Sequence, residues 1–351
     1  MLRSDYSELI RLGFQPGDSV DVHFSSGKVL EDIPFLSGCI LPQRMICLNA
    51  HEGFDWIRIE KRFGSAWELC GLRGDETGRV LLREAQKYVF LYRVFNTEFS
   101  LNRDDYPSDE CFTNYRELSG GQLRRRTIYR SVASFDPFSN IPEFRERQKY
   151  LGRLMEREGI RFVINMTCDR QQMKTLFESG MYKGYYIQKL YDDGKICSDL
   201  FSVDFSGSVF RKQLTSALRI LLKQTGPYLI QCKAGLDRTG FFCSLIGALA
   251  GAEAGEITEE YMRSYDYLFG LTRETDREKY DILCRCHAER NTDIITQGIS
   301  SSEECVPGEA LPSPRRKPEY AAGLCAAAEK YLEQCGPTGS ELAGLKRLLT
   351  E

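Results

Sequence analysis

The fold is decided by residues 228–249, which read YLIQCKAGLDRTGFFCSLIGAL. The short, mostly apolar run Tyr228–Gln231 predicts a buried strand. A loop that contains Gly235 follows, and an apolar helix begins near Thr239. Strand, loop and helix in this order are typical of an open α/β sheet, which binds ligands where its parallel strands end.

Helices and strands also alternate around this stretch. We therefore predict an α/β domain over residues 96–351, with a mainly parallel central sheet flanked by helices. The other predicted elements are helices at 143–158 and 210–223, a strand at 162–164, a loop near 300–318, and C-terminal helices within 320–349 that are split near Gly336-Pro337.

The N-terminal part has a different pattern. Short β-branched and aromatic runs alternate with Gly, Pro and Asp, and Val20, Val22 and Phe24 alternate with polar residues. The turn residues 16–18 have a weak echo at 73–75. We predict a small β-rich, barrel-like domain over residues 1–95, followed by a polar linker at Arg103–Pro107.

Composition excludes several classes of protein. The 351 residues carry 47 basic and 50 acidic side chains, so the net charge of -3 provides no field for nucleic acid. No apolar run is long enough to span a membrane, and the first residues lack the apolar core of a signal peptide. Three scattered histidines do not predict a metal site, and no cofactor is expected. Because the first residues do not resemble a signal peptide, we predict a cytoplasmic protein in which the 13 cysteines are reduced thiols.

One cysteine stands in a special context. Cys232 and Arg238 lie six positions apart, but chance alone predicts about one such pair in this chain, and Cys284 with Arg290 is a second. The second pair has no glycine between its ends and no apolar strand before it. Only the first pair has a sequence that can wrap backbone amides around an anion.

The first pair predicts a site for phosphate or sulfate. Loop amides and the helix N-terminus point into one concavity, and the planar fork of Arg238 binds two phosphoryl oxygens. The same positive field favours the reactive thiolate form of Cys232. The residues expected to bind phosphate are Lys233, Ala234, Gly235, Leu236, Arg238 and Gly240.

These residues resemble the phosphate loop of cysteine-dependent protein tyrosine phosphatases, and more narrowly of the bacterial family, which is related to dual-specificity and phosphoinositide phosphatases. That loop reads cysteine, any residue, alanine, glycine, lysine, aspartate, arginine, threonine, glycine. Three further stretches are similar to the family and extend the resemblance over roughly residues 110 to 351. They are Asn114–Leu118 with Gly120-Gly121, Ile128–Ser131, and the tail with Pro318–Tyr320 and Tyr331-Leu332.

The resemblance implies a protein tyrosine phosphatase-like fold and a phosphoric monoester hydrolase. The expected activity is that of a tyrosine phosphatase, and a dual-specificity phosphatase is also open. The enzyme would act through a phosphocysteine at Cys232 without a metal. The resemblance implies that Asp237 is the general acid, with Asp199 and Asp204 as upstream alternatives. Thr239 is expected to donate to the departing thiolate.

Two departures keep other functions open. Gln231 replaces the histidine that usually precedes the cysteine, and Leu236 replaces a lysine, while Lys233 follows the nucleophile. Lys233 motivates a phosphoinositide or inositol phosphate phosphatase as the alternative. Gln231 and the extra N-terminal domain motivate a binding module for phosphorylated ligands without turnover. Arg116 and Arg130 are expected either to line the pocket or to support its walls.

Overall fold

The computed structural model describes most of the chain. The described residues fall into two compact units, separated in the sequence between Glu98 and Phe99. The second unit contains the predicted site. The described residues are 5–39, 45–50, 57–61, 71–72, 76–96, 98–137, 142–199, 202, 205, 207–297 and 323–351.

The second unit is built on a five-stranded sheet with the order β6-β7-β10-β8-β9. β10 lies between β7 and β8 and is parallel to both, β9 is parallel to β8, and β6 is antiparallel to β7. The predicted α/β class with a mainly parallel sheet is confirmed. The strands are β6 (Arg116–Glu117), β7 (Ile128–Ser131), β8 (Phe162–Asn165), β9 (Ile196–Cys197) and β10 (Tyr228–Gln231).

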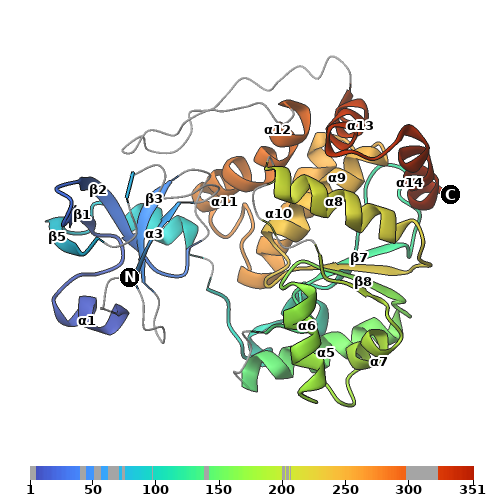
Figure 1. Ribbon diagram of the computed structural model, residues 1–351, viewed down its shortest axis with the longest axis horizontal. Coiled ribbons are helices and arrows are strands. Elements are labelled where there is room, and N and C mark those ends of the chain that lie inside the picture. The colour runs from blue at the N-terminus through green and yellow to red at the C-terminus, as the bar shows by residue number, and fades with distance from the viewer. Residues whose placement is uncertain are drawn as a thin grey trace. The chain divides into compact units, whose positions relative to one another are not determined.

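Helices cover both faces of this sheet, with α5, α6 and α7 on one side and α8, α9 and α10 on the other (Figure 1). For this reason, each of the strands β7, β8 and β10 has all four of its residues buried. The helices are α4 (Asp109–Phe112), α5 (Pro142–Arg157), α6 (Arg170–Glu178), α7 (Tyr186–Asp192), α8 (Ser208–Leu221), α9 (Asp237–Leu249), α10 (Ala254–Phe269), α11 (Arg277–Leu283), α12 (Arg290–Gln297), α13 (Gly323–Cys335) and α14 (Gly339–Thr350), with a 3-10 turn η1 (Arg103–Asp105) and a π-helix η2 (Cys284–Glu289).

These bounds confirm the predicted helices at 143–158 and 210–223 and the division of the C-terminal helices near Gly336. α9 begins at Asp237, two residues before the predicted start, where an acidic first-turn side chain complements the helix dipole. The predicted loop at 300–318 lies outside the described residues. Within the described part, no helix combines the length and the hydropathy that a membrane crossing needs.

The predicted linker at Arg103–Pro107 is wrong. This segment belongs to the second unit, where Tyr106 is buried. The Arg147 guanidinium of α5 lies over the rings of Phe99 and Phe112, at 4.4 and 4.5 Å from their centroids, and donates to the Tyr106 hydroxyl at 3.1 Å. Burial lowers the pKa of Arg147 to about 10. Partners that are distant in sequence therefore order this polar stretch.

The first unit contains a sheet of order β4-β3-β2-β1-β5. β1 is antiparallel to β2 and β5, and β2 and β3 are parallel. Val20, Val22 and Phe24 are all buried, which confirms their alternation. The described strands show no pairing of β4 with β5, and residues 73–75 lie outside the described part, so the barrel and the domain boundary stay predictions. The elements are α1 (Tyr6–Arg11), β1 (Ser19–Phe24), β2 (Val29–Leu36), β3 (Ile46–Ala50), β4 (Ile57–Lys61), β5 (Gly78–Glu84) and α3 (Val89–Phe95).

Candidate active site

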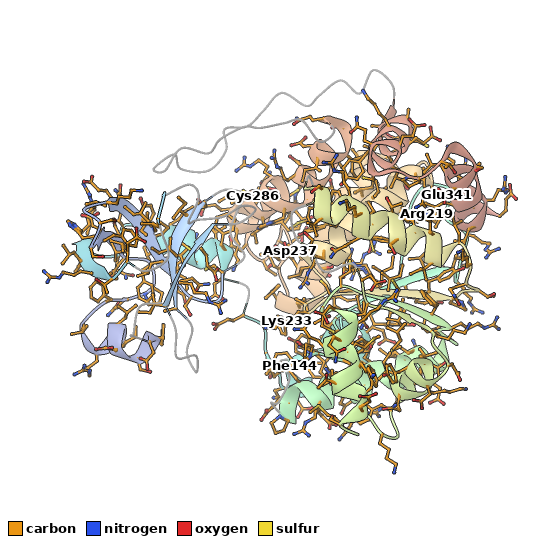
Figure 2. The ribbon with its side chains drawn as sticks, viewed as in Figure 1. Phe144, Arg219, Lys233, Asp237, Cys286 and Glu341 are labelled. Atoms are coloured by element: carbon orange, nitrogen blue, oxygen red, sulfur yellow. The ribbon has the colours of Figure 1, made fainter. Side chains whose placement is uncertain are left out.

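Cys232 follows the last residue of the central strand β10, at the carboxyl edge of the sheet. Its side chain is buried, whereas Lys233 is exposed and Asp237 and Arg238 are partly exposed. Lys233 lies in the loop between β10 and α9, and Asp237 opens the helix (Figure 2). The structure thus gathers the predicted loop residues where the parallel strands end.

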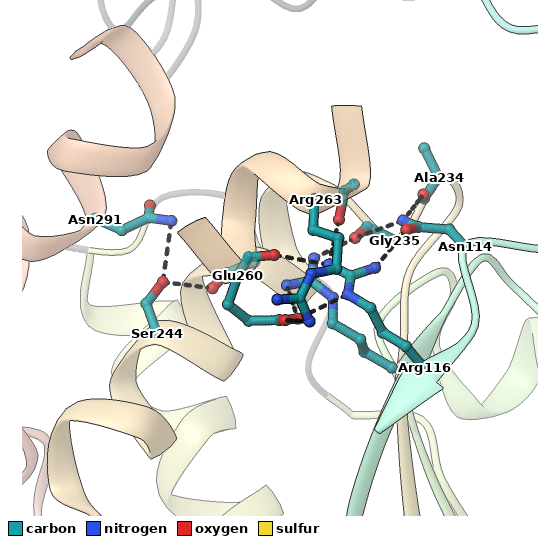
Figure 3. Close-up of polar contacts among 11 residues, drawn as sticks. Asn114, Arg116, Ala234, Gly235, Ser244, Glu260, Arg263 and Asn291 are labelled. Atoms are coloured by element: carbon teal, nitrogen blue, oxygen red, sulfur yellow. Dashed lines mark hydrogen bonds and ion pairs between the residues drawn. The ribbon is translucent and has the colours of Figure 1, made fainter. Parts of the chain in front are cut away.

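The loop is held from one side by what we call the back wall, which consists of Asn114, Arg116, Arg130, Glu260 and the backbone at Ala133. The back wall binds three consecutive carbonyl groups of the loop, and Figure 3 shows the contacts of two of them, Ala234 and Gly235. Lys233 O accepts from Ala133 N at 3.3 Å, Ala234 O accepts from Asn114 Nδ2 at 3.2 Å, and Gly235 O accepts from Arg130 Nη2 at 2.7 Å and from Asn114 Nδ2 at 3.3 Å.

These contacts set the direction of the loop amides. In a planar trans peptide the C=O and the next N–H point in opposite directions. The N–H groups of Ala234 and Leu236 therefore point away from the back wall, and they donate no hydrogen bond within the described part of the chain. Together with the N-terminus of α9 they form an arrangement that binds an anion such as phosphate.

Gly235 permits the close approach of loop and back wall. Its φ of +67° is in the left-handed region, and a Cβ there would lie 2.4 Å from Ser131 O and 2.9 Å from Asn114 Nδ2. Both contacts are too short, so any side chain would displace the loop from the back wall.

The charged part of the back wall is buried. Arg116 Nε lies 2.9 Å from Glu260 Oε1, and Arg130 Nη1 lies 3.5 Å from the same oxygen. The exposed fractions of the three side chains are 6%, 1% and 6% for Arg116, Arg130 and Glu260. Burial lowers the pKa of Arg116 to about 10, the like charge of Arg130 adds to this, and Glu260 opposes it. Arg116 and Arg130 thus lie behind the loop.

Asn114 links this ion cluster to the loop. Its φ of +50° is left-handed, a conformation that asparagine tolerates better than most residues. Arg116 Nη1 donates to Asn114 Oδ1 at 2.6 Å, so the side-chain nitrogen of Asn114 is the atom that faces the loop. Within the Asn114–Leu118 motif, Arg116 therefore fixes the orientation of the Asn114 amide, and Asn114 in turn binds the loop.

Thr239 and Arg238 occupy the first turn of α9. Thr239 is completely buried, and its Oγ1 has no hydrogen-bond partner within the described residues. Such a buried hydroxyl is costly unless a further group takes its hydrogen bond. Arg238 Nη1 donates to Met166 O, just beyond the end of β8, so the guanidinium lies at the same sheet edge as Cys232.

Of the two upstream candidates for the general acid, only Asp199 lies within the described residues. Asp199, which follows β9, accepts from Arg170 Nε at 2.6 Å and forms an ion pair with this arginine. Asp204 lies outside the described residues. Phe205, which is next in the chain, stacks on Phe241 of α9 at a centroid distance of 4.2 Å.

The second cysteine-arginine pair has no such loop. Cys284–Glu289 forms a π-helix that continues into α12, and Cys284 Sγ lies 3.9 Å from Glu289 Oε1. Burial, followed by the charge of Glu289, raises the pKa of Cys284 to about 12. Within the described part, no group of histidine, cysteine and acidic residues is arranged to hold a metal ion.

Sequence reasoning missed Glu260, the carboxylate to which both buried arginines pair. Glu260 lies one turn after Ile257 and one turn before Ser264, on the buried face of α10. An acidic residue on an apolar helix face was the available signal. Its partners are not visible in the sequence, because Arg116 is 144 residues away.

Comparison with known proteins adds to this geometry. Residues 201–351 match the tyrosine phosphatase family. A tyrosine-protein phosphatase from Nostoc commune is 41% identical over 58 residues, which are 16% of this chain and 20% of that relative. The match thus spans about a fifth of the curated relative's length.

Two solved structures are similar to part of the chain. P. aeruginosa TpbA is 19% identical, with a TM-score of 0.29, over 51% of this chain and 87% of that one. The core catalytic domain of the PP-IP phosphatase SIW14 from S. cerevisiae is 21% identical, with a TM-score of 0.27, over 55% and 93%. The segment 201–351, which matches the tyrosine phosphatase family, contains Cys232, Arg238 and the whole loop between them.

Proposed function

We propose that this protein is a cysteine-dependent phosphoric monoester hydrolase, and specifically a protein tyrosine phosphatase. The observation that carries the proposal is the loop between Cys232 and Arg238. The back wall binds its carbonyl groups, and the N–H groups of Ala234 and Leu236 point to the other side and have no hydrogen-bond partner among the described residues. The family match of residues 201–351 supports the same activity.

The proposed reaction has two steps. The Cys232 thiolate attacks phosphorus in line, the S–P bond forms, and the P–O bond to the leaving group breaks as Asp237 protonates that oxygen. Water then attacks phosphorus and gives its proton to the Asp237 carboxylate. The S–P bond breaks, and inorganic phosphate and the thiolate are released.

The other loop residues stabilise charge in both steps. The amides of the loop and the fork of Arg238 take up the negative charge of the transferring phosphoryl group. Thr239, whose hydroxyl has no hydrogen-bond partner in the described part of the chain, donates to the thiolate that leaves in the second step. In this proposal Arg116 and Arg130 support the loop and do not bind substrate.

Turnover of p-nitrophenyl phosphate in the presence of EDTA tests the activity. We expect the rate to be the same with and without EDTA, because the thiolate is the nucleophile and the loop supplies the positive field. Loss of the rate with EDTA would contradict the thiolate mechanism. Phosphate binding without any turnover would instead support the binding module.

The general acid is tested by Asp237→Asn. We expect the rate on p-nitrophenyl phosphate to fall by about 10²-fold, with a larger loss on an alkyl phosphate, whose leaving oxygen needs the proton more. Asp199→Asn is the control, because Asp199 already pairs with Arg170. If Asp204→Asn shows the dependence on leaving group and Asp237→Asn does not, the acid is Asp204.

A phosphoinositide or inositol phosphate is the second candidate substrate. The exposure of Lys233, directly after the nucleophile, favours it, because an exposed ammonium attracts a second phosphate group. A comparison of kcat/KM on a phosphotyrosine peptide, a soluble inositol phosphate and phosphoinositide vesicles decides between the substrates.

We place the reaction in the cytoplasm, where Cys232 stays reduced.

A further inference from the structure

A chain of hydrogen bonds among buried, uncharged residues crosses the carboxyl edge of the sheet next to Cys232. We call it the amide network. It consists of Ser134, Gln231, Asn165, Ser198 and Cys168, all of which are at most 2% exposed. Gln231 Oε1 accepts from Ser134 N at 3.0 Å, Gln231 Nε2 donates to Asn165 Oδ1 at 3.1 Å, Asn165 Nδ2 donates to Ser198 Oγ at 2.9 Å, and Ser198 Oγ donates to Cys168 O at 2.6 Å.

The amide network connects the parts of the chain that surround the nucleophile. Gln231 pairs with Ser131 of β7 on one side and with Asn165 of β8 on the other. Ser198 follows β9 directly. The network therefore ties together the ends of the four parallel strands, and Gln231 is the member next to Cys232 in the chain.

Cys232 is bracketed by two contacts to the same segment. The side chain of Gln231 binds the N–H of Ser134, and the carbonyl of Lys233 binds the N–H of Ala133 at 3.3 Å. Two consecutive amides thus hold the residues on both sides of the thiol. The contacts determine the orientation of the Gln231 amide, because its oxygen must accept and its nitrogen must donate.

From these contacts we propose that Gln231 is a positioning residue for the attack of Cys232 on phosphorus, an inference that rests on the proposed phosphatase function. In-line attack requires sulfur at a defined place, and a displacement of about 1 Å costs about 10²-fold in rate. Gln231 acts through Cys232 only. The phosphate contacts come from the loop amides and Arg238, to which the Gln231 side chain makes no hydrogen bond among the described residues.

The substitution Gln231→Met keeps the length of the side chain and removes both hydrogen bonds. We expect kcat on p-nitrophenyl phosphate to fall by between about 10-fold and 10²-fold. The dissociation constant of inorganic phosphate, measured by titration calorimetry, should change by less than about threefold, because its ligands are untouched. A merely structural residue would change both in proportion to the loss of folded protein.

A double-mutant cycle tests whether Gln231 acts as part of the amide network. Asn165→Leu alone should lower kcat, and the double variant Gln231→Met with Asn165→Leu should lose no more than about threefold beyond Gln231→Met alone. Gln148→Met is the matched control. Gln148 is also buried, but it is not a member of the amide network, and its Oε1 accepts from the Tyr182 hydroxyl at 3.0 Å. The value of kcat per folded molecule should therefore stay unchanged.

The outcomes separate the inference from the proposed function. Wild-type protein without turnover would reject the proposed function. Active wild type with a Gln231→Met variant within threefold of its kcat would overturn the inference alone. A parallel loss of kcat and phosphate affinity, or multiplicative effects in the cycle, would also overturn it.

Discussion

Cys232→Ser is expected to lower turnover of p-nitrophenyl phosphate by at least about 10⁴-fold, while inorganic phosphate still binds. A serine hydroxyl does not ionise near neutral pH. The positive field of the loop, which favours a thiolate, is not sufficient to turn the hydroxyl into an alkoxide nucleophile. Phosphate affinity should persist, because the amides of Ala234 and Leu236 and the guanidinium of Arg238 remain. The loss should therefore appear in kcat.

Rapid quenching of a single turnover locates the intermediate. Trypsin releases residues 224–233, a peptide in which Cys232 is the sole cysteine, so a phosphate found on it identifies the nucleophile. Cys284→Ser is the matched control, since it changes the cysteine of the second pair, which lies in a π-helix, and it should leave turnover unchanged. Substantial turnover by Cys232→Ser would move the nucleophile elsewhere.

Glu260→Gln is expected to destabilise the protein by about 3–5 kcal/mol. The carboxylate of Glu260 compensates Arg116 and Arg130, whose side chains are almost fully buried. An amide keeps the shape and one acceptor oxygen but removes the charge, which leaves two like charges in the interior. Such a loss is a large part of the stability of a typical domain.

Urea unfolding measures this difference. Glu259→Gln is the control, because Glu259 is the exposed neighbour on α10 and its change should stay within about 0.5 kcal/mol. Residual folded Glu260→Gln should also bind phosphate more weakly, since Arg130 holds the Gly235 carbonyl at 2.7 Å. A destabilisation below about 1 kcal/mol would contradict the view that Glu260 compensates both arginines.

Local patterns predicted much of the second unit. Apolar spacing located α5, α8 and β10, because these elements bury one face or both faces of a continuous segment. The same reasoning failed at Arg103–Pro107. Polar and proline-containing sequence is typical of a linker, but Arg147, more than 40 residues later, orders Tyr106 through a contact that no local pattern contains.

The candidate site divides in the same way. Cys232, Gly235, Asp237, Arg238 and Thr239 were predicted because they stand in one short segment whose order of strand, loop and helix implies the geometry. The false pair at Cys284 was also recognised from the sequence, since it has no glycine and no preceding strand. These are properties of neighbouring residues in the chain.

The sequence by itself therefore determined the α/β class and the position of the loop that contains Cys232, the proposed nucleophile. Only the tertiary structure decided which way the loop amides point, because that direction is set by Asn114, Arg130 and Ala133, which lie about a hundred residues away along the chain. It also decided that Glu260 pairs with Arg116, Arg130 and Arg263 and that Gln231 belongs to a network across four strands. Hydrogen bonds and buried ion pairs depend on distance in space, and a sequence without its fold contains only distance along the chain.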